Sequence, residues 1–156
     1  MPEMPEMPKM PEMPEHARGQ SSIIPYLVMT QCADAIAFYK SVFGARELFR
    51  TASPEGTIGH AELDIGGARV MVADAHPGSS VQSPAVLGGT TITLTLYVDD
   101  ADGVFDQAVA AGAHIDDPVK EKPYGDRSGT IIDPVGHRWT IATHRRDVAP
   151  QELERI

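Results

Sequence analysis

The chain has 156 residues, a net charge of −9 at pH 7 and 42% hydrophobic residues. That length fits one domain or two small modules packed together, and the apolar content is sufficient for a buried core. The negative charge argues against nucleic acid or an anionic membrane surface as a partner. No apolar run could span a membrane, no secretory leader pattern is present, and Cys32 has no second cysteine to pair with, so a cytoplasmic protein is expected.

Residues 1–21 differ in composition from the rest of the chain. They begin MPEMPEMPKMPEMPE, with proline at every third position. Proline has no backbone N–H and is excluded from helix interiors and central strands. We therefore predict a disordered, extended tail that contributes no catalytic chemistry, with docking through its methionines as the alternative.

Residues 22–75 show strand and helix patterns in the order βαβββ. Apolar residues recur at helical spacing from Ala33 to Phe43, and Gly44 is placed to end that helix. Strands are expected over residues 23–30, 45–51, 57–65 and 69–74, with tight turns at 53–56 and at Gly66-Gly67.

The same order returns in residues 90–146, after a linker at 76–89 that is rich in Pro, Gly and Ser. The pattern predicts strands over 91–98 and 113–115, a helix over 102–111, an open loop to Tyr124, and a hairpin of strands 128–133 and 138–143. The hairpin turns at Asp133-Pro134-Val135-Gly136, because proline presets φ and glycine accepts a positive φ. Residues 147–156 are predicted to be a polar C-terminal tail with a helical turn after Pro150.

An internal repeat supports this division into two modules. Three residues of the first module recur 69 positions later: Gly67, Arg69 and Ala73 match Gly136, Arg138 and Ala142. The spacing is longer than that of solenoid repeats, so two copies of a larger unit explain it better. The expected fold class is therefore α+β, with two tandem βαβββ modules.

Two sequence stretches, AFYKSVFGA and YGDRSGTIIDPVGHRWTIATH, carry a family resemblance. In two βαβββ modules, they resemble the glyoxalase/bleomycin-resistance/dioxygenase superfamily, which has the vicinal oxygen chelate fold, and most closely its demethylubiquinone-methyltransferase-like branch. The resemblance covers residues 22–146. It implies two curled mixed sheets around a cavity, helices outside, and a homodimer.

Enzymes of this superfamily hold a divalent metal ion at four positions, on the first and last strand of each module. Those positions fall on Pro25, Met71, Thr93 and Thr140. Proline and methionine offer no donor to a hard metal ion, and neutral threonine is a poor donor. We therefore expect no metal ion and no other cofactor, and we interpret Met71, Thr93 and Thr140 as residues that line a ligand site.

The strand over residues 57–65 carries the candidate catalytic pair, His60 and Glu62. Strand alternation places Ala61, Leu63 and Ile65 toward the helices, and it places Ile58, His60, Glu62 and Asp64 toward the cavity. A histidine and a carboxylate on one strand face could share a substrate proton, or Glu62 could orient His60. The repeat matches them with Gly129 and Ile131, so only one module has the pair. The alternative is a hydrogen-bonded pair without function.

Tyr124 and Arg127 precede the final hairpin and are expected to line the mouth of the cavity, where they would select a polar or anionic group. A structural contact between Asp126 and Arg127 is the alternative.

The sequence as a whole favours a homodimeric protein that binds a small organic molecule, as in resistance by sequestration. A metal-dependent lyase or dioxygenase, or metal-free proton transfer through His60, is the enzymatic alternative, and whether the protein is an enzyme stays open. A regulatory protein whose tail binds another chain is a third interpretation. Fold does not decide among these functions, because function depends on the site.

Overall fold

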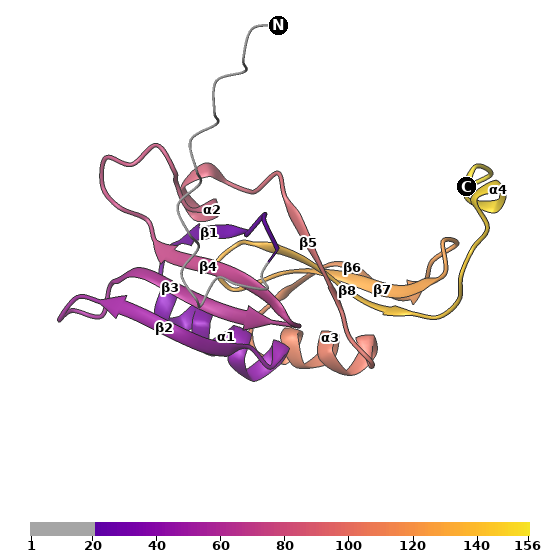
Figure 1. Ribbon diagram of the computed structural model, residues 1–156, viewed down its shortest axis with the longest axis horizontal. Coiled ribbons are helices and arrows are strands. Elements are labelled where there is room, and N and C mark those ends of the chain that lie inside the picture. Colours follow the sequence, from indigo (N-terminus) through magenta and orange to yellow (C-terminus); the bar gives the residue numbers. More distant parts are fainter. Residues whose placement is uncertain (1–20) are drawn as a thin grey trace, which may run out of the picture.

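The computed structural model describes residues 21–156 and contains two βαβββ modules in tandem (Figure 1). The first module comprises β1 (Tyr26–Met29), α1 (Cys32–Phe43), β2 (Arg46–Ala52), β3 (Ile58–Ile65) and β4 (Ala68–Asp74). The second comprises β5 (Thr93–Tyr97), α3 (Ala101–Ala110), β6 (His114–Glu121), β7 (Asp126–Ile132) and β8 (Arg138–His144). Two short helices, α2 (Pro84–Leu87) and α4 (Pro150–Leu153), lie in the linker and near the C-terminus. The tail predicted at residues 1–21 lies, except for Ser21, outside the described residues.

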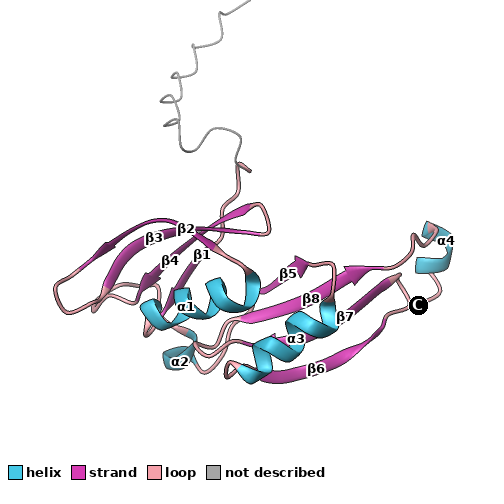
Figure 2. Ribbon diagram, turned by 90° about the horizontal axis from the view of Figure 1, so that it is seen from below, coloured by secondary structure: helices cyan, strands magenta, loops and turns pink. Residues whose placement is uncertain are grey.

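Each module forms its own four-stranded mixed sheet. The strand orders are β1-β4-β3-β2 and β5-β8-β7-β6, with a parallel first pair in each sheet and antiparallel pairs elsewhere. The sheets lie side by side along the length of the molecule, and α1 and α3 lie next to each other on the same side (Figures 1 and 2). The predicted α+β class and the repeated module order are confirmed.

One face of each sheet packs against a helix and builds the core. The side chains of Ile36 and Tyr39 on α1 are fully buried together with Leu63 on β3 and Ile141 on β8. Burial of such apolar side chains is the main stabilising term of a small domain. No helix within residues 21–156 covers the opposite face of either sheet, and we refer to it as the open face.

Asp133 joins the two modules. It is 1% exposed and lies in the turn between β7 and β8. It accepts hydrogen bonds from Tyr39 Oη (2.5 Å) in the first module, and from Trp139 Nε1 (2.9 Å) and the amides of Val135 and His137 in the second. Burial, followed by the charge of Asp133, raises the pKa of Tyr39 well above its usual range, so its hydroxyl remains a donor. The module boundary thus contains a buried carboxylate with its hydrogen-bonding capacity filled, beside the contacts of Trp139 with the rings of Tyr39 and Phe43.

Two segments differ from the sequence prediction. β6 runs from His114 to Glu121, where a short strand and an open loop were expected. β6 contains Pro118, which it accommodates because it is an edge strand with register shifts on both sides of Asp117, and such positions tolerate proline. The linker contains α2, which Ser83 caps by accepting a hydrogen bond from the amide of Val86. The predicted helical turn after Pro150 is confirmed as α4.

Candidate functional site

His60 and Glu62 lie on the open face of the first sheet, as predicted. Ile58, which was expected to accompany them, is fully buried in the core, and that part of the prediction is wrong. The register between β2 and β3 shifts between Thr51 and Ala52, so the alternation restarts at His60. The predicted counterparts in the second module are also wrong by one residue: Thr130, not Ile131, pairs with Thr140 as Glu62 pairs with Met71.

A chain of polar contacts runs from Tyr26 on β1 to Arg69 on β4. Tyr26 Oη lies 3.2 Å from His60 Nδ1, and His60 Nε2 lies 3.4 Å from Glu62 Oε1. Arg69 Nη1 donates to the other carboxylate oxygen, Glu62 Oε2, at 2.5 Å. Glu62 and Arg69 are buried, His60 is half-buried and Tyr26 is exposed. We call these four residues the polar chain, and it leads from a buried ion pair to the surface.

Aromatic rings surround the histidine at the middle of the polar chain. The ring of Tyr26 stacks on that of His60, with centroids 5.5 Å apart and an angle of 23° between the rings. Phe49 of β2 contacts His60 at 5.8 Å. Both rings remain almost half exposed, at 47% for Tyr26 and 43% for Phe49. Exposed aromatic rings beside a buried polar group are typical of a surface that binds another molecule.

A cavity of about 530 Å³ borders Tyr26 at the β1 edge of the sheet. It separates Tyr26 and Val28 from the linker that leads to β5, and the apolar side chains of Val81, Leu87 and Ile92 face it. Its volume falls within the range of small-molecule sites, roughly 300–1,000 Å³. We call it the β1-edge cavity.

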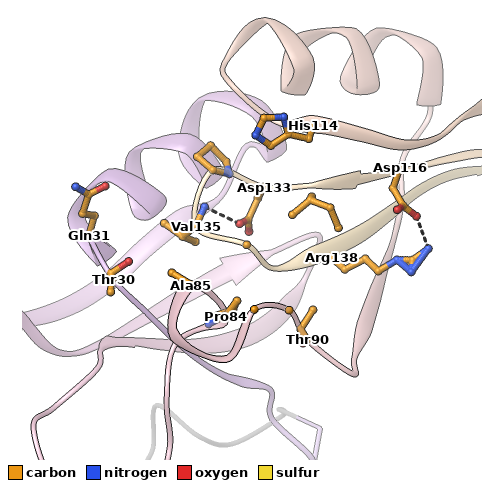
Figure 3. Close-up of a pocket in the computed structure, with 15 residues that line it drawn as sticks. Thr30, Gln31, Pro84, Ala85, Thr90, His114, Asp116, Asp133, Val135 and Arg138 are labelled. Atoms are coloured by element: carbon orange, nitrogen blue, oxygen red, sulfur yellow. Dashed lines mark hydrogen bonds and ion pairs between the residues drawn. The ribbon is translucent and has the colours of Figure 1, made fainter.

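A second cavity, of about 570 Å³, lies at the module junction between α2 and the β7–β8 turn (Figure 3). At one end it contains an ion pair between Arg138 and Asp116, whose side chains point toward each other at 2.6 Å. None of the predicted site residues lines this cavity or the β1-edge cavity, but Tyr26, which contacts His60, borders the latter. Since the acceptor atoms of Asp133 are occupied by the donors of the protein itself, we consider the β1-edge cavity the stronger candidate site.

The other predicted ligand-binding residues lie in different places. Met71 is half-buried on the open face of the first sheet, opposite Tyr26 and Glu62. Thr93 is exposed at the start of β5, and Thr140 Oγ1 lies 2.8 Å from Thr130 Oγ1 on the second sheet.

Tyr124 and Arg127 do not contact the four residues of the polar chain. Tyr124 is exposed and lies in the turn between β6 and β7. Arg127 donates two hydrogen bonds to Asp102 of α3, at 2.7 and 2.9 Å, so it lies on the helix side of its sheet. The contact between Asp126 and Arg127 that was the alternative is replaced by this ion pair with α3.

The residues at the four metal positions of the superfamily do not fit a divalent ion. The amide of Met71 donates to the carbonyl of Pro25, and the strand partner of Thr140 is Thr95, two residues beyond Thr93. Proline, methionine and threonine side chains are weak ligands for such ions. Within residues 21–156, no group of three or more His, Cys, Asp or Glu side chains is arranged to hold a metal ion.

Sequence analysis missed Tyr26, Phe49 and Arg69. Arg69 could have been found, because the two-residue turn after Ile65 places it diagonally opposite Glu62. Phe49 lies beside a register shift, so simple alternation gives no guide to its face. Tyr26 meets His60 only because β1 pairs in parallel with β4, and a pairing between distant segments is not visible in local patterns.

A second polar cluster lies at the end of the other sheet. Asp126 accepts hydrogen bonds from Tyr97 Oη (2.8 Å) and from His144 Nδ1 (2.9 Å), and His144 Nε2 lies 2.7 Å from Asp147. Hydrogen bonding to Asp126, and then to Asp147, raises the pKa of His144 above its usual value. In its protonated form, His144 can donate to both carboxylates and so link the start of the C-terminal segment to β7.

We expect this cluster to make stability depend on pH. A raised pKa in the folded state means that protonated His144 stabilises the fold below its usual pKa of about 6.5, and that this contribution is lost as pH rises through the raised value. The melting temperature should therefore fall more steeply between pH 6 and 8 in the wild type than in His144→Gln. Calorimetry across that range checks this, and identical slopes would contradict it.

No helix among the described residues is long and apolar enough to cross a lipid bilayer.

Comparison with known proteins agrees with the fold. The chain is 38% identical to protein Rv0887c of Mycobacterium tuberculosis over 138 residues, which are 86% of this chain and 81% of that protein. The structure is similar to that of TioX from Micromonospora sp. ML1, with a TM-score of 0.62, 36% identity, and coverage of 80% of this chain and 98% of TioX.

A third similar structure shows the fold alone. It is the putative 3-demethylubiquinone-9 3-methyltransferase PhnB of Bacillus cereus, with a TM-score of 0.64, 20% identity, and coverage of 79% of this chain and 99% of that one. The sequence model of the Glyoxalase/Bleomycin resistance protein/Dioxygenase superfamily matches residues 22–141. Because this model matches most of the chain, and because the structure has the two βαβββ modules and two mixed sheets, the chain belongs to the Glyoxalase/Bleomycin resistance protein/Dioxygenase superfamily.

Proposed function

We propose that the protein binds a small organic molecule in the β1-edge cavity, without a resident metal ion. One observation carries this proposal: the exposed side chain of Tyr26 borders the cavity and also contacts His60, which Glu62 holds from the buried side. The site thus combines an apolar wall with a few polar side chains, Tyr26, Gln82, Thr90, Thr91 and His137, which is the usual composition of a small-molecule site. The chemistry of the residues at the four metal positions supports the absence of a metal ion.

The biological role that we favour is sequestration, as in resistance to a toxic compound. Binding alone requires a wall and a few fixed polar groups, and the β1-edge cavity has both. The enzymatic alternative is a metal-dependent lyase or dioxygenase, or metal-free proton transfer through His60. A cytoplasmic location, in keeping with the single cysteine, is part of the proposal.

We further propose that the protein is a homodimer in which the first module of one chain packs near the second module of the other. Both open faces carry exposed aromatic side chains, with Tyr26 and Phe49 on the first sheet and Tyr97 on the second. A second copy would cover such faces and close the ligand site. Light scattering on the protein at micromolar concentration checks this, and a monomer mass would contradict it.

A screen of small organic compounds by thermal shift, in buffer with EDTA, tests the binding function. A compound at a hundred times its dissociation constant stabilises the fold by about 2.7 kcal/mol, which is a shift of several degrees. His60→Ala should lower the affinity of a compound found in this way about tenfold, because it removes the support of Tyr26. Since His60 is half-buried on an open face, the melting temperature without ligand should change by less than about 3 °C.

His76→Ala is the matched control, because His76 is exposed and lies outside the cavity. It should leave the affinity unchanged. If no compound shifts the melting temperature, or if His60→Ala unfolds the protein without a selective loss of affinity, the binding function is wrong. If binding requires an added divalent ion, and elemental analysis finds that ion in the purified protein, the metal-dependent alternative replaces it.

A further inference from the structure

The outer edge of β1 turns backbone groups toward the β1-edge cavity. β1 is the outermost strand of the first sheet, and within residues 21–156 no strand pairs with its outer side. On its inner side, the carbonyls of Pro25 and Met29 accept hydrogen bonds from β4 and from the residue after it, at 2.9 and 2.8 Å. Since the backbone groups of successive residues in a strand point to alternate sides, those of Tyr26 and Val28 point outward.

A side-chain contact agrees with this direction. His137 Nε2, from the turn between β7 and β8, lies 2.9 Å from the carbonyl oxygen of Val28. A carbonyl only accepts, so His137 donates this hydrogen bond. The N–H of Val28 and both backbone groups of Tyr26 then remain along the outer edge. The side chain of Tyr26 reaches inward across β4 to His60, so at the strand edge a molecule in the cavity meets the backbone of Tyr26.

The rest of the cavity suits an extended ligand with apolar side chains. α2 lies next to β1 (Figure 1), and the wall that faces the strand includes Val81, Leu87 and Ile92. Each of these three side chains is more than half exposed. β1 has four residues, which span roughly 13 Å at about 3.3 Å per residue. A ligand about three residues long matches that edge.

The backbone groups at the edge determine the chemical class of the ligand. The two N–H groups of Tyr26 and Val28 need acceptors, and the C=O of Tyr26 needs a donor, at the spacing of alternate residues in a strand. An extended peptide backbone offers donors and acceptors at that spacing. We propose that the β1-edge cavity takes a short peptide, which adds to β1 as a further strand. This inference rests on the proposed function, whose ligand it assigns to a chemical class.

Two other occupants of this edge are less suitable or are separated by the test. Residues 1–15 of the same chain have proline at every third position, and proline has no N–H to donate to the carbonyl of Tyr26. A second copy of the chain could pair through an outer strand of its own, and its occupancy would depend on protein concentration.

The blocked peptide acetyl-Leu-Thr-Leu-amide and two methylated forms of it test the inference by calorimetric titration. One form is methylated at the threonine nitrogen, and the other at both leucine nitrogens. In an extended peptide these two sets of N–H groups point to opposite edges, and only one edge can face β1. One methylated form should therefore bind about tenfold more weakly than the parent, and the other within about threefold of it.

Hydrogen exchange of single amides in the full-length chain locates the peptide. The amide of Leu27 faces β4, whereas that of Tyr26 faces the cavity, so Tyr26 should exchange faster in the free protein. With saturating peptide, the ratio of the two exchange rates should fall at least tenfold. A general stabilisation of the fold would slow both amides alike and would leave this ratio unchanged.

Two variants at one position separate the backbone donor from its side chain. Val28→Pro removes the outward N–H, at an edge position where proline disrupts no pairing with β4, and should weaken the parent peptide about tenfold. Val28→Ala keeps the N–H and should bind the peptide within about threefold of the wild type. Melting curves establish that both are folded. If Val28→Pro is not, the methylated peptides and the exchange rates of the wild type decide the question.

Absence of binding by the parent peptide, equal effects of the two methylations, or an unchanged ratio of exchange rates would each overturn the inference. A Tyr26 amide that is protected without peptide would also overturn it. If that protection disappears on dilution, the edge belongs to a second copy, and if it disappears on removal of residues 1–20, it belongs to that segment. The proposed function is tested separately, because a non-peptide hit in the thermal-shift screen that depends on His60 would support the function while rejecting the peptide.

Discussion

Asp133→Ala should lower the melting temperature by roughly 10 °C or more. The carboxylate of Asp133 accepts two side-chain and two backbone hydrogen bonds at a fully buried position, as described above. Its removal leaves Tyr39 Oη and Trp139 Nε1 without their acceptor inside the core. Buried donors that lose their partner cost about 1–3 kcal/mol each, so a total near 4 kcal/mol is a moderate expectation. At 2–4 °C per kcal/mol, this gives the stated range.

Calorimetry or circular dichroism measures the effect, and two variants bracket it. Tyr39→Phe removes one donor and leaves the carboxylate its others, so it should lower the free energy of unfolding by only about 1–2 kcal/mol. Asp106→Ala changes an exposed aspartate on α3, so it should alter stability by less than about 0.5 kcal/mol. If Asp133→Ala behaved like Asp106→Ala, the junction would not depend on this carboxylate.

Gly129→Ala should destabilise the second module by about 2–3 kcal/mol. Gly129 lies in β7 beneath α3, where a methyl group would come within 2.8 Å of Phe105 Cε2 and 2.9 Å of the backbone nitrogen of Val119. Contacts this short force the helix or the edge strand β6 to move, and overpacking of a core costs about 1–3 kcal/mol. Chemical denaturation of the variant measures the loss.

The same substitution at Gly59 provides the control. A methyl group there meets only Thr51, with Oγ1 at 3.4 Å and the carbonyl oxygen at 3.9 Å. Replacing glycine by alanine at an unstrained position stabilises a protein by about 0.4–1 kcal/mol through the unfolded state, so Gly59→Ala should be neutral or slightly stabilising. Equal losses at Gly59 and Gly129 would mean that crowding under α3 is not the cause.

The sequence was sufficient to predict the modules, because their signals are local. The alternation of apolar and polar residues predicts strands over 57–65 and 91–98, and Gly44 predicts the end of a helix. Each of these signals spans only a few residues of sequence. Where a loop or a linker was expected, the prediction was wrong: β6 continues through Pro118, and the linker contains α2. Proline marks a break only where its missing N–H is needed, and an edge strand or a first helical turn does not need it.

The site was predictable only in part. His60 and Glu62 share a face through the geometry of one strand, which alternation reveals. Their partners come from other strands, and Tyr26 in particular depends on the parallel pairing of β1 with β4. For Arg127 the prediction named a residue that does not belong to the site. Its place near Tyr124 in the sequence suggested the mouth of a cavity, but its side chain pairs with Asp102 on α3. A position near a loop in the sequence predicts that a side chain is exposed, but it does not predict which face of the sheet the side chain points to.

Pro118 has a further consequence for how the molecules of this protein meet one another. β6 is the outermost strand of the second sheet, and outer strands are where sheets of separate molecules join into larger aggregates. Proline at the middle of that strand removes one N–H, and the register shifts beside it distort the row of groups that an incoming strand would need. Pro118 thus protects the second sheet against uncontrolled growth at this edge.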